Sequence, residues 1–96
     1  MPVYVIADGR APDPSKLDEY RRRNAELIPA HGGRFLARGG TTEVLEGAWE
    51  PGRLVIMEFP DRDAARRWYD SAEYAEIRAQ RQANSETDIV LVEGAG

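Results

Sequence analysis

The stretch RLVIMEFPDRDAARRWYDSAEYAEIRAQR, residues 53–81, decides the fold of this chain. Arg53–Phe59 is apolar on both of its alternating faces, which predicts a strand covered on both sides. Pro60-Asp61 then opens a helix with Asp61 as its N-cap, and Ser71 is expected to cap a second helical segment. One acid, Glu58, interrupts the apolar strand, and a polar group in an apolar surface marks a candidate site.

Three other segments have the composition of strands. They are Val3–Ala7, Arg34–Arg38 and Thr87–Val92, each short and rich in apolar residues, and they end at Asp8-Gly9, Gly39-Gly40 and Glu93-Gly94. The second of them is broken by Gly39-Gly40, and we expect it to resume over Thr42–Leu45 across a bulge or bend. The sheet should therefore have four strands.

A helix is predicted over residues 14–28 from positions that recur at helical spacing on one face, namely Leu17, Tyr20, Asn24, Leu27 and Ile28. Asp13 is expected to cap it, and Pro29 with Gly32-Gly33 to end it. The order of elements is then β-α-β-β-α-β, so residues 1–96 form one α+β domain of the ferredoxin-like class. In that class two helices lie on one face of a four-stranded antiparallel sheet.

The other face of this sheet needs a cover. Strands one, three and four are apolar on both faces, and the chain has no third helix to cover the face of the sheet that the two helices leave open. The simplest cover is the same face of a second copy, related by a two-fold axis. We therefore expect a homodimer that packs through its sheet faces.

Composition excludes several classes of protein. The net charge of −4 and the pI of about 5.0 argue against nucleic acid or an acidic membrane as a partner. The chain has no cysteine and only one histidine, His31, so we expect no metal site and no cofactor. No apolar run is long enough to span a bilayer and no signal peptide is visible, which favours a cytoplasmic protein.

An ordered set of motifs along nearly the whole chain resembles the DUF1330 family of small proteins of uncharacterised function. The motifs are GGRFLARGG (32–40), EVLEG (43–47), RLVIMEFP (53–60), WYDSAEY (68–74), Arg81 and the closing VEG (92–94). The resemblance implies a dimeric α+β barrel, in agreement with the fold and dimer predicted above. It implies no reaction, because the members share no agreed activity.

Glu58 and His31 are the two candidates for proton transfer. A half-buried carboxylate either becomes an acid or base with a raised pKa or pairs with a cation, and Arg38 or Arg81 would be that cation. His31 follows a helix end, where it either exchanges protons near neutral pH or bonds to the last helical carbonyls.

The candidate ligand-binding residues combine anion binding with aromatic surface. Arg38 before two glycines would clamp a carboxylate or phosphate, and the aromatic residues would orient a ring. A structural role is open for each: a core position for Trp68, and an N-cap for Ser71. The full set is Arg38, Trp68, Tyr69, Ser71, Tyr74 and Arg81.

Three functions remain open at this point. The first is the binding of a small organic molecule, anionic or aromatic, in a pocket between the sheet and the helices. The second is a non-catalytic structural or regulatory homodimer with a buried Glu–Arg network. The third, by analogy with related barrels, is a cofactor-free monooxygenase or isomerase. The sequence does not decide whether the protein is an enzyme.

Overall fold

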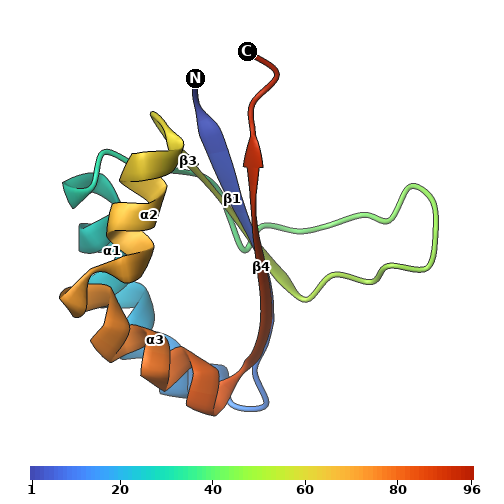
Figure 1. Ribbon diagram of the computed structural model, residues 1–96. Coiled ribbons are helices and arrows are strands. Elements are labelled where there is room, and N and C mark those ends of the chain that lie inside the picture. Colours follow the sequence, from blue (N-terminus) through green and yellow to red (C-terminus); the bar gives the residue numbers. More distant parts are fainter.

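A computed structural model describes residues 1–96 and contains one four-stranded antiparallel sheet with all helices on one face (Figure 1). The strand order is β2-β3-β1-β4, so the predicted ferredoxin-like α+β fold is confirmed. Its elements, in chain order, are β1 (Val3–Arg10), a 3-10 turn η1 (Pro14–Leu17), α1 (Asp18–Ala30), β2 (Arg34–Arg38), β3 (Arg53–Phe59), α2 (Arg62–Asp70), α3 (Ala72–Asn84) and β4 (Glu86–Glu93).

The alternation of residues along β3 separates the two faces of the sheet. Met57 and Phe59 are buried under the helices, and Val55 lies on the same side. Ile56 and Glu58 therefore point to the opposite face, as period-2 geometry requires. The antiparallel register of β1 and β3 places Val5 opposite Met57, so Val5 also points to the helices and its neighbours in β1 point to the opposite face.

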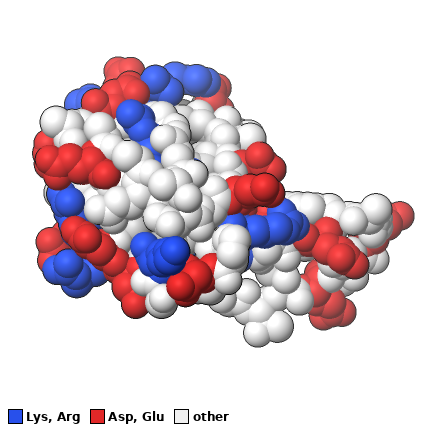
Figure 2. Space-filling model, turned by 90° about the horizontal axis from the view of Figure 1, so that it is seen from below, with Lys and Arg blue, Asp and Glu red and all other residues white.

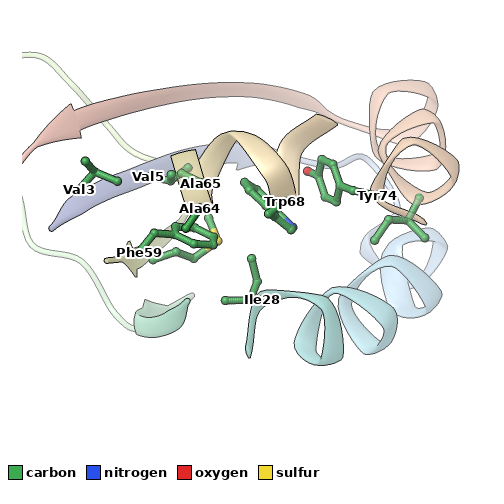
Figure 3. Close-up of a cluster of buried hydrophobic side chains, with 10 residues drawn as sticks. Val3, Val5, Ile28, Phe59, Ala64, Ala65, Trp68 and Tyr74 are labelled. Carbon is green, nitrogen blue, oxygen red and sulfur yellow. The ribbon is translucent and has the colours of Figure 1, made fainter. Parts of the chain in front are cut away.

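An aromatic stack fills the core between the sheet and the helices (Figure 3). The ring of Phe59 stacks on Trp68 with centroids 5.6 Å apart, and Trp68 meets Tyr74 at 4.4 Å. All three side chains are almost completely buried. Each buried aromatic contributes about 1.5–3 kcal/mol or more before entropy is subtracted, so this stack is the main tie between β3, α2 and α3.

The caps predicted at Asp61 and Ser71 are confirmed, whereas Asp13 caps only the turn η1, and α1, which begins at Asp18, has no side-chain cap. The carboxylate of Asp61 accepts a hydrogen bond from the Ala64 backbone N–H at 2.8 Å, and Asp13 caps η1 in the same way. Ser71 separates α2 from α3: its hydroxyl accepts from the Tyr74 N–H at 3.1 Å and donates to the Trp68 carbonyl at 2.8 Å. The break at Ser71 turns the chain while leaving Trp68 and Tyr74 in contact.

The end of α1 differs from the prediction. Pro29 lies inside the helix, which continues to Ala30. The helix ends in a Schellman motif, in which Gly32 has a φ of +82°, its N–H donates to the Pro29 carbonyl and the Gly33 N–H donates to that of Ile28. The positive φ of Gly32, rather than the proline, therefore ends α1.

The segment between β2 and β3 also differs from the prediction. The second strand does not resume over Thr42–Leu45, and the bulge lies within β2, between Phe35 and Ala37, instead of at Gly39-Gly40. Residues 39–52, here called the arm, form an irregular loop that projects from the body (Figures 1 and 2). The arm has three acids and no basic residue, and its apolar side chains at Leu45 and Trp49 are exposed.

Removing the cap between α2 and α3 should weaken the fold. We expect Ser71→Ala to lower the free energy of unfolding by about 1 kcal/mol, because it leaves the Tyr74 N–H without its partner. Ser71→Asp, which keeps a capping oxygen, is the matched control and should stay within about 0.5 kcal/mol of the parent. Urea unfolding followed by circular dichroism measures both; equal losses in the two variants would contradict the capping role.

Candidate functional site

A cavity of about 240 Å³ lies between the helices and the sheet. It sits where β1 ends and β3 and β4 begin, beyond the aromatic stack. Its volume is that of about eight liquid waters and lies below the ~300–1,000 Å³ of pockets for drug-sized ligands. A small organic molecule is the size of ligand that fits. The larger apolar side chains that line it are Leu17, Phe35, Val55, Met57, Trp68 and Ile89.

The charged lining of the cavity is entirely basic. Five of its nineteen lining residues are arginine and none is aspartate or glutamate, although the chain as a whole carries a net charge of −4. Like charges gathered around one hollow repel one another, and a bound anion relieves that repulsion. The arginines are Arg10, Arg21, Arg38, Arg53 and Arg81.

Arg81 is the most unusual of the five. Arg81 is only 7% exposed and forms none of the seven ion pairs of the protein. Its Nε has no hydrogen-bond partner. A buried charge ordinarily has a counter-charge or a full set of hydrogen bonds, because its removal from water costs several kcal/mol. Arg81 therefore has unused capacity to bind an anion.

Two tyrosine hydroxyls lie beside Arg81. Tyr20 from α1 and Tyr74 from α3 share a hydrogen bond of 2.6 Å. Burial, reinforced by Tyr74, raises the pKa of Tyr20 far above its ordinary value, so this hydroxyl stays protonated. Burial acts to lower the pKa of Arg81, but its tyrosine neighbours outweigh burial and the net pKa shift is upward. The guanidinium of Arg81 is thus charged, and no acidic side chain pairs with it.

A second buried hydrogen bond fixes the inner wall of the cavity. The indole N–H of Trp68 donates to the side-chain oxygen of Asn24 at 3.0 Å. Asn24 lies on α1 and Trp68 on α2, so this bond joins two helices whose side chains both line the cavity. A buried bond with both partners satisfied holds the wall in one geometry.

Three arginines surround the outer part of the cavity. The guanidinium carbon of Arg38 lies 4.3 Å from the centre of the Phe35 ring, a cation–π contact. Burial lowers the pKa of Arg53, and the neighbouring charges of Arg21 and Arg38 lower that pKa further. Neither Arg38 nor Arg53 forms an ion pair, and Arg21 has only a loose one, 3.9 Å from the exposed Asp18.

The backbone at Gly39 allows Arg53 to reach this position. Gly39 has a φ of +72°, and a Cβ there would fall 2.5 Å from the Arg53 Nε. Any larger residue would therefore displace the Arg53 side chain as well as strain the turn. The Gly39 that follows Arg38 is needed to bring two guanidinium groups to the same opening.

Asp8 holds the base of the arm next to this opening. Its carboxylate accepts hydrogen bonds from the Trp49 indole N–H at 2.9 Å and from the Gly52 backbone N–H at 2.7 Å. Arg10, which lines the cavity, lies 3.7 Å from Asp8 and also donates to the Glu50 carbonyl. The bond from Trp49 lowers the pKa of Asp8 despite the opposing effect of burial, with Gly52 and Arg10 adding to the shift.

The structure brings together three of the ligand-binding residues expected from the sequence. Arg38, Trp68 and Arg81 line the cavity. Tyr74 lies just behind it, reaching it through the hydroxyl of Tyr20. The remaining two lie outside the lining: Ser71 caps α3, and Tyr69 meets Trp68 edge to face, with the guanidinium of Arg78 5.0 Å from the centre of its ring.

The two residues expected to transfer protons lie away from the cavity. Glu58 is on the opposite face of the sheet and pairs with Arg34 at 2.8 Å, not with Arg38 or Arg81 as predicted. The strand's alternation makes this necessary, because Met57 and Phe59 on either side of Glu58 point to the helices. The Nδ1 of His31 lies 3.0 Å from the Leu27 carbonyl, to which it donates at the end of α1.

Several lining residues were missed in the sequence. Tyr20, Asn24 and Arg21 belong to the predicted amphipathic helix, where the first two were assigned only to its buried side. An asparagine on a buried helix face was the available signal, because a buried amide needs a partner. No comparable signal marks Phe35 or Arg53, whose positions depend on the bulge and on Gly39.

Neither a cluster of metal-ligating side chains nor a membrane-spanning helix is found. No group of three or more metal-ligating His, Cys, Asp or Glu side chains is assembled anywhere in the chain. None of the helices has both the length and the apolar character needed to cross a bilayer.

Comparison with known proteins identifies the family. Residues 2–95 match the domain of unknown function DUF1330, and the chain belongs to this family. No curated protein sequence matches it. A crystal structure of a protein of unknown function from Rhodopseudomonas palustris is 18% identical, with a TM-score of 0.79, and the match covers 99% of this chain and 83% of that one.

Two other solved structures share the fold. A dimeric ferredoxin-like protein of unknown function from Jannaschia sp. CCS1 has a TM-score of 0.75 at 14% identity, over 98% of this chain and 100% of that one. SnoaB, a cofactor-independent oxygenase from Streptomyces nogalater, has a TM-score of 0.68 at 15% identity, over 99% and 94%. At these identities the likeness concerns the fold alone.

The anchor at Asp8 should make stability sensitive to acid. Because the folded pKa of Asp8 is depressed, its stabilising contribution is complete above the unfolded value of about 3.9 and is lost as pH falls through the lower folded value. We expect Asp8→Asn to be less stable than the parent at pH 7 and the difference to shrink progressively below about pH 4. Thermal melting across this range measures it. Glu43→Gln, in the exposed arm, is the control, and a difference that persists unchanged at low pH would contradict the assignment.

Proposed function

We propose that this protein binds a small organic anion in the cavity between its sheet and its helices. The observation that carries the proposal is Arg81, a buried guanidinium in the lining that has no counter-ion in its own chain. A planar carboxylate is the natural partner of a guanidinium, because two parallel N–H···O bonds match its geometry. The apolar side chains around Arg81 suit the hydrocarbon part of such a molecule.

Binding is a better supported function than catalysis. The lining contains no carboxylate, histidine, cysteine or lysine, so it offers no obvious general base. One structural neighbour is an oxygenase, but the lining of this cavity offers no residue that would act as the base in such a reaction. The hydrogen-bonded tyrosine pair is more suited to hold a ligand oxygen than to accept a proton from it.

Replacing Arg81 tests this proposal directly. If Arg81 is kept for a ligand, Arg81→Met should remove an uncompensated buried charge and raise the free energy of unfolding of the free protein by about 1 kcal/mol or more. Benzoate in excess should raise the melting temperature of the parent protein but not of this variant, since a ligand at 100 times its Kd stabilises by about 2.7 kcal/mol.

Two further variants sharpen the same test. Arg67→Met removes an exposed arginine from α2 and should respond to benzoate like the parent. Arg81→Lys keeps the charge but loses the planar fork, so its response to benzoate should be intermediate. If Arg81→Met unfolds more easily and still responds to benzoate, the arginine is structural and the proposal fails.

We further propose that a second copy of the chain covers the open face of the sheet. Large apolar side chains stay exposed on the strands there, with Val90 57% and Val92 47% exposed. Each contributes about 1.5–3 kcal/mol when fully buried, before entropy is subtracted. The dimeric neighbour from Jannaschia has the same fold, which supports this arrangement.

A charge on the open face should separate the copies. We expect the parent chain to sediment as a dimer at micromolar concentration and Val90→Lys to sediment as a monomer, because a lysine there would be buried without a partner. Ala79→Lys, on the exposed side of α3, should remain dimeric. Analytical ultracentrifugation distinguishes the two states. A monomeric parent would rule out the covered face.

A further inference from the structure

Three of the five arginines that line the cavity, Arg38, Arg53 and Arg81, form two groups that approach it from different elements of the fold. Arg38 ends β2, which is one edge strand, and Arg53 begins the adjacent β3. Arg81 comes from α3, which leads directly into β4 at the other edge. With strands about 4.8 Å apart, the edge strands β2 and β4 are about 14 Å from each other; Arg38 starts from β2, and Arg81 starts from the helix that precedes β4.

The two groups differ in their surroundings. Arg81, the inner group, is buried beside the hydroxyls of two tyrosines. Arg38 and Arg53 form the outer group, where Arg38 is exposed, Arg53 is half-buried, and neither has an acidic partner. A single anionic group on the ligand would leave the mutual repulsion of the outer arginines unrelieved.

The space between the two groups is apolar. Phe35, Val55 and Met57 rise from the sheet on the outer side, and Ile89 and Trp68 contribute to the inner side. The guanidinium of Arg38 lies over the Phe35 ring, so a flat group that enters beside Phe35 meets an aromatic face and a cation together. These surfaces fit a hydrocarbon middle, and aromatic rings especially.

We infer that the ligand is an organic molecule with two acidic groups separated by a flat apolar middle, one group on Arg81 and the other between Arg38 and Arg53. This inference rests on the proposed anion binding and adds the second acidic group and its location. It also accounts for Gly39, whose lack of a side chain makes room for Arg53 at the opening. Both ends of such a ligand would be held by charge, which fixes its direction in the cavity.

Terephthalate and benzoate form the pair of probes that tests the inference. They share one ring and one carboxylate and differ in the second carboxylate, and both are fully ionised at pH 7.5. The quantity to measure is the ratio of the Kd for benzoate to the Kd for terephthalate, by isothermal titration calorimetry at fixed ionic strength. We expect a ratio of at least ten in the parent protein, which corresponds to about 1.4 kcal/mol.

Variants then locate the second acidic group. Arg53→Gln should reduce the ratio to below about three, because it removes a charge that only the second carboxylate uses. Arg22→Gln is the matched control: it removes an exposed arginine from α1 that does not line the cavity, and the ratio should remain at its parental value. The control separates a specific contact from a general preference of a basic surface for a dianion.

The outcomes distinguish this inference from the function on which it rests. A ratio near one in the parent protein, or a ratio unchanged by Arg53→Gln, overturns the second acidic group while benzoate binding through Arg81 still stands. If neither acid binds the parent protein, the proposed function itself fails. If Arg22→Gln and Arg53→Gln lower the ratio equally, the preference is general electrostatics and the inference is overturned.

Discussion

The aromatic stack of Phe59, Trp68 and Tyr74 is the contact on which the other elements depend. It ties β3 to α2 and α3 across the break at Ser71. The same residues also position α1, because the Trp68 indole binds Asn24 and the Tyr74 hydroxyl binds Tyr20. The stack occupies one end of the space between sheet and helices. The other end remains hollow, and its wall is made from the polar edges of the stack.

The position of Arg81 follows from the same helix that places Tyr74 in the stack. It lies seven residues, two helical turns, after Tyr74 and therefore on the same face of α3. Tyr74 at the stacked end of that face packs into the core, while Arg81 at the other end meets the cavity. A hydrocarbon side chain there would bury well, so an unpartnered guanidinium is a cost to folding, and the proposed ligand binding would account for it. Stability and the proposed binding thus make opposite demands on this position.

Some features were predictable because they depend on local physics. The strand Arg53–Phe59, the caps at Asp61 and Ser71 and the core position of Trp68 follow from alternation, capping preference and helical spacing. Arg38 and Arg81 were recognised as anion-binding candidates by residue type. Glu58 was expected beside Arg38 or Arg81, which was wrong, since nothing local indicates that Arg34 lies opposite it across β2 and β3.

By itself the sequence determined the fold class, the apolar nature of both sheet faces and the excess of arginine over lysine available for anion binding. These features follow from the periodicity and composition of the sequence, because they depend on residues that are close together in the chain. Only the tertiary structure decided which polar residues share a cavity and which lie behind the sheet. That choice depends on β2 pairing with a bulge, on Gly39 admitting Arg53, and on α1 meeting α2 and α3 through two hydrogen bonds. Each of these joins residues far apart in the chain, and their meeting is a property of packing that no local pattern encodes.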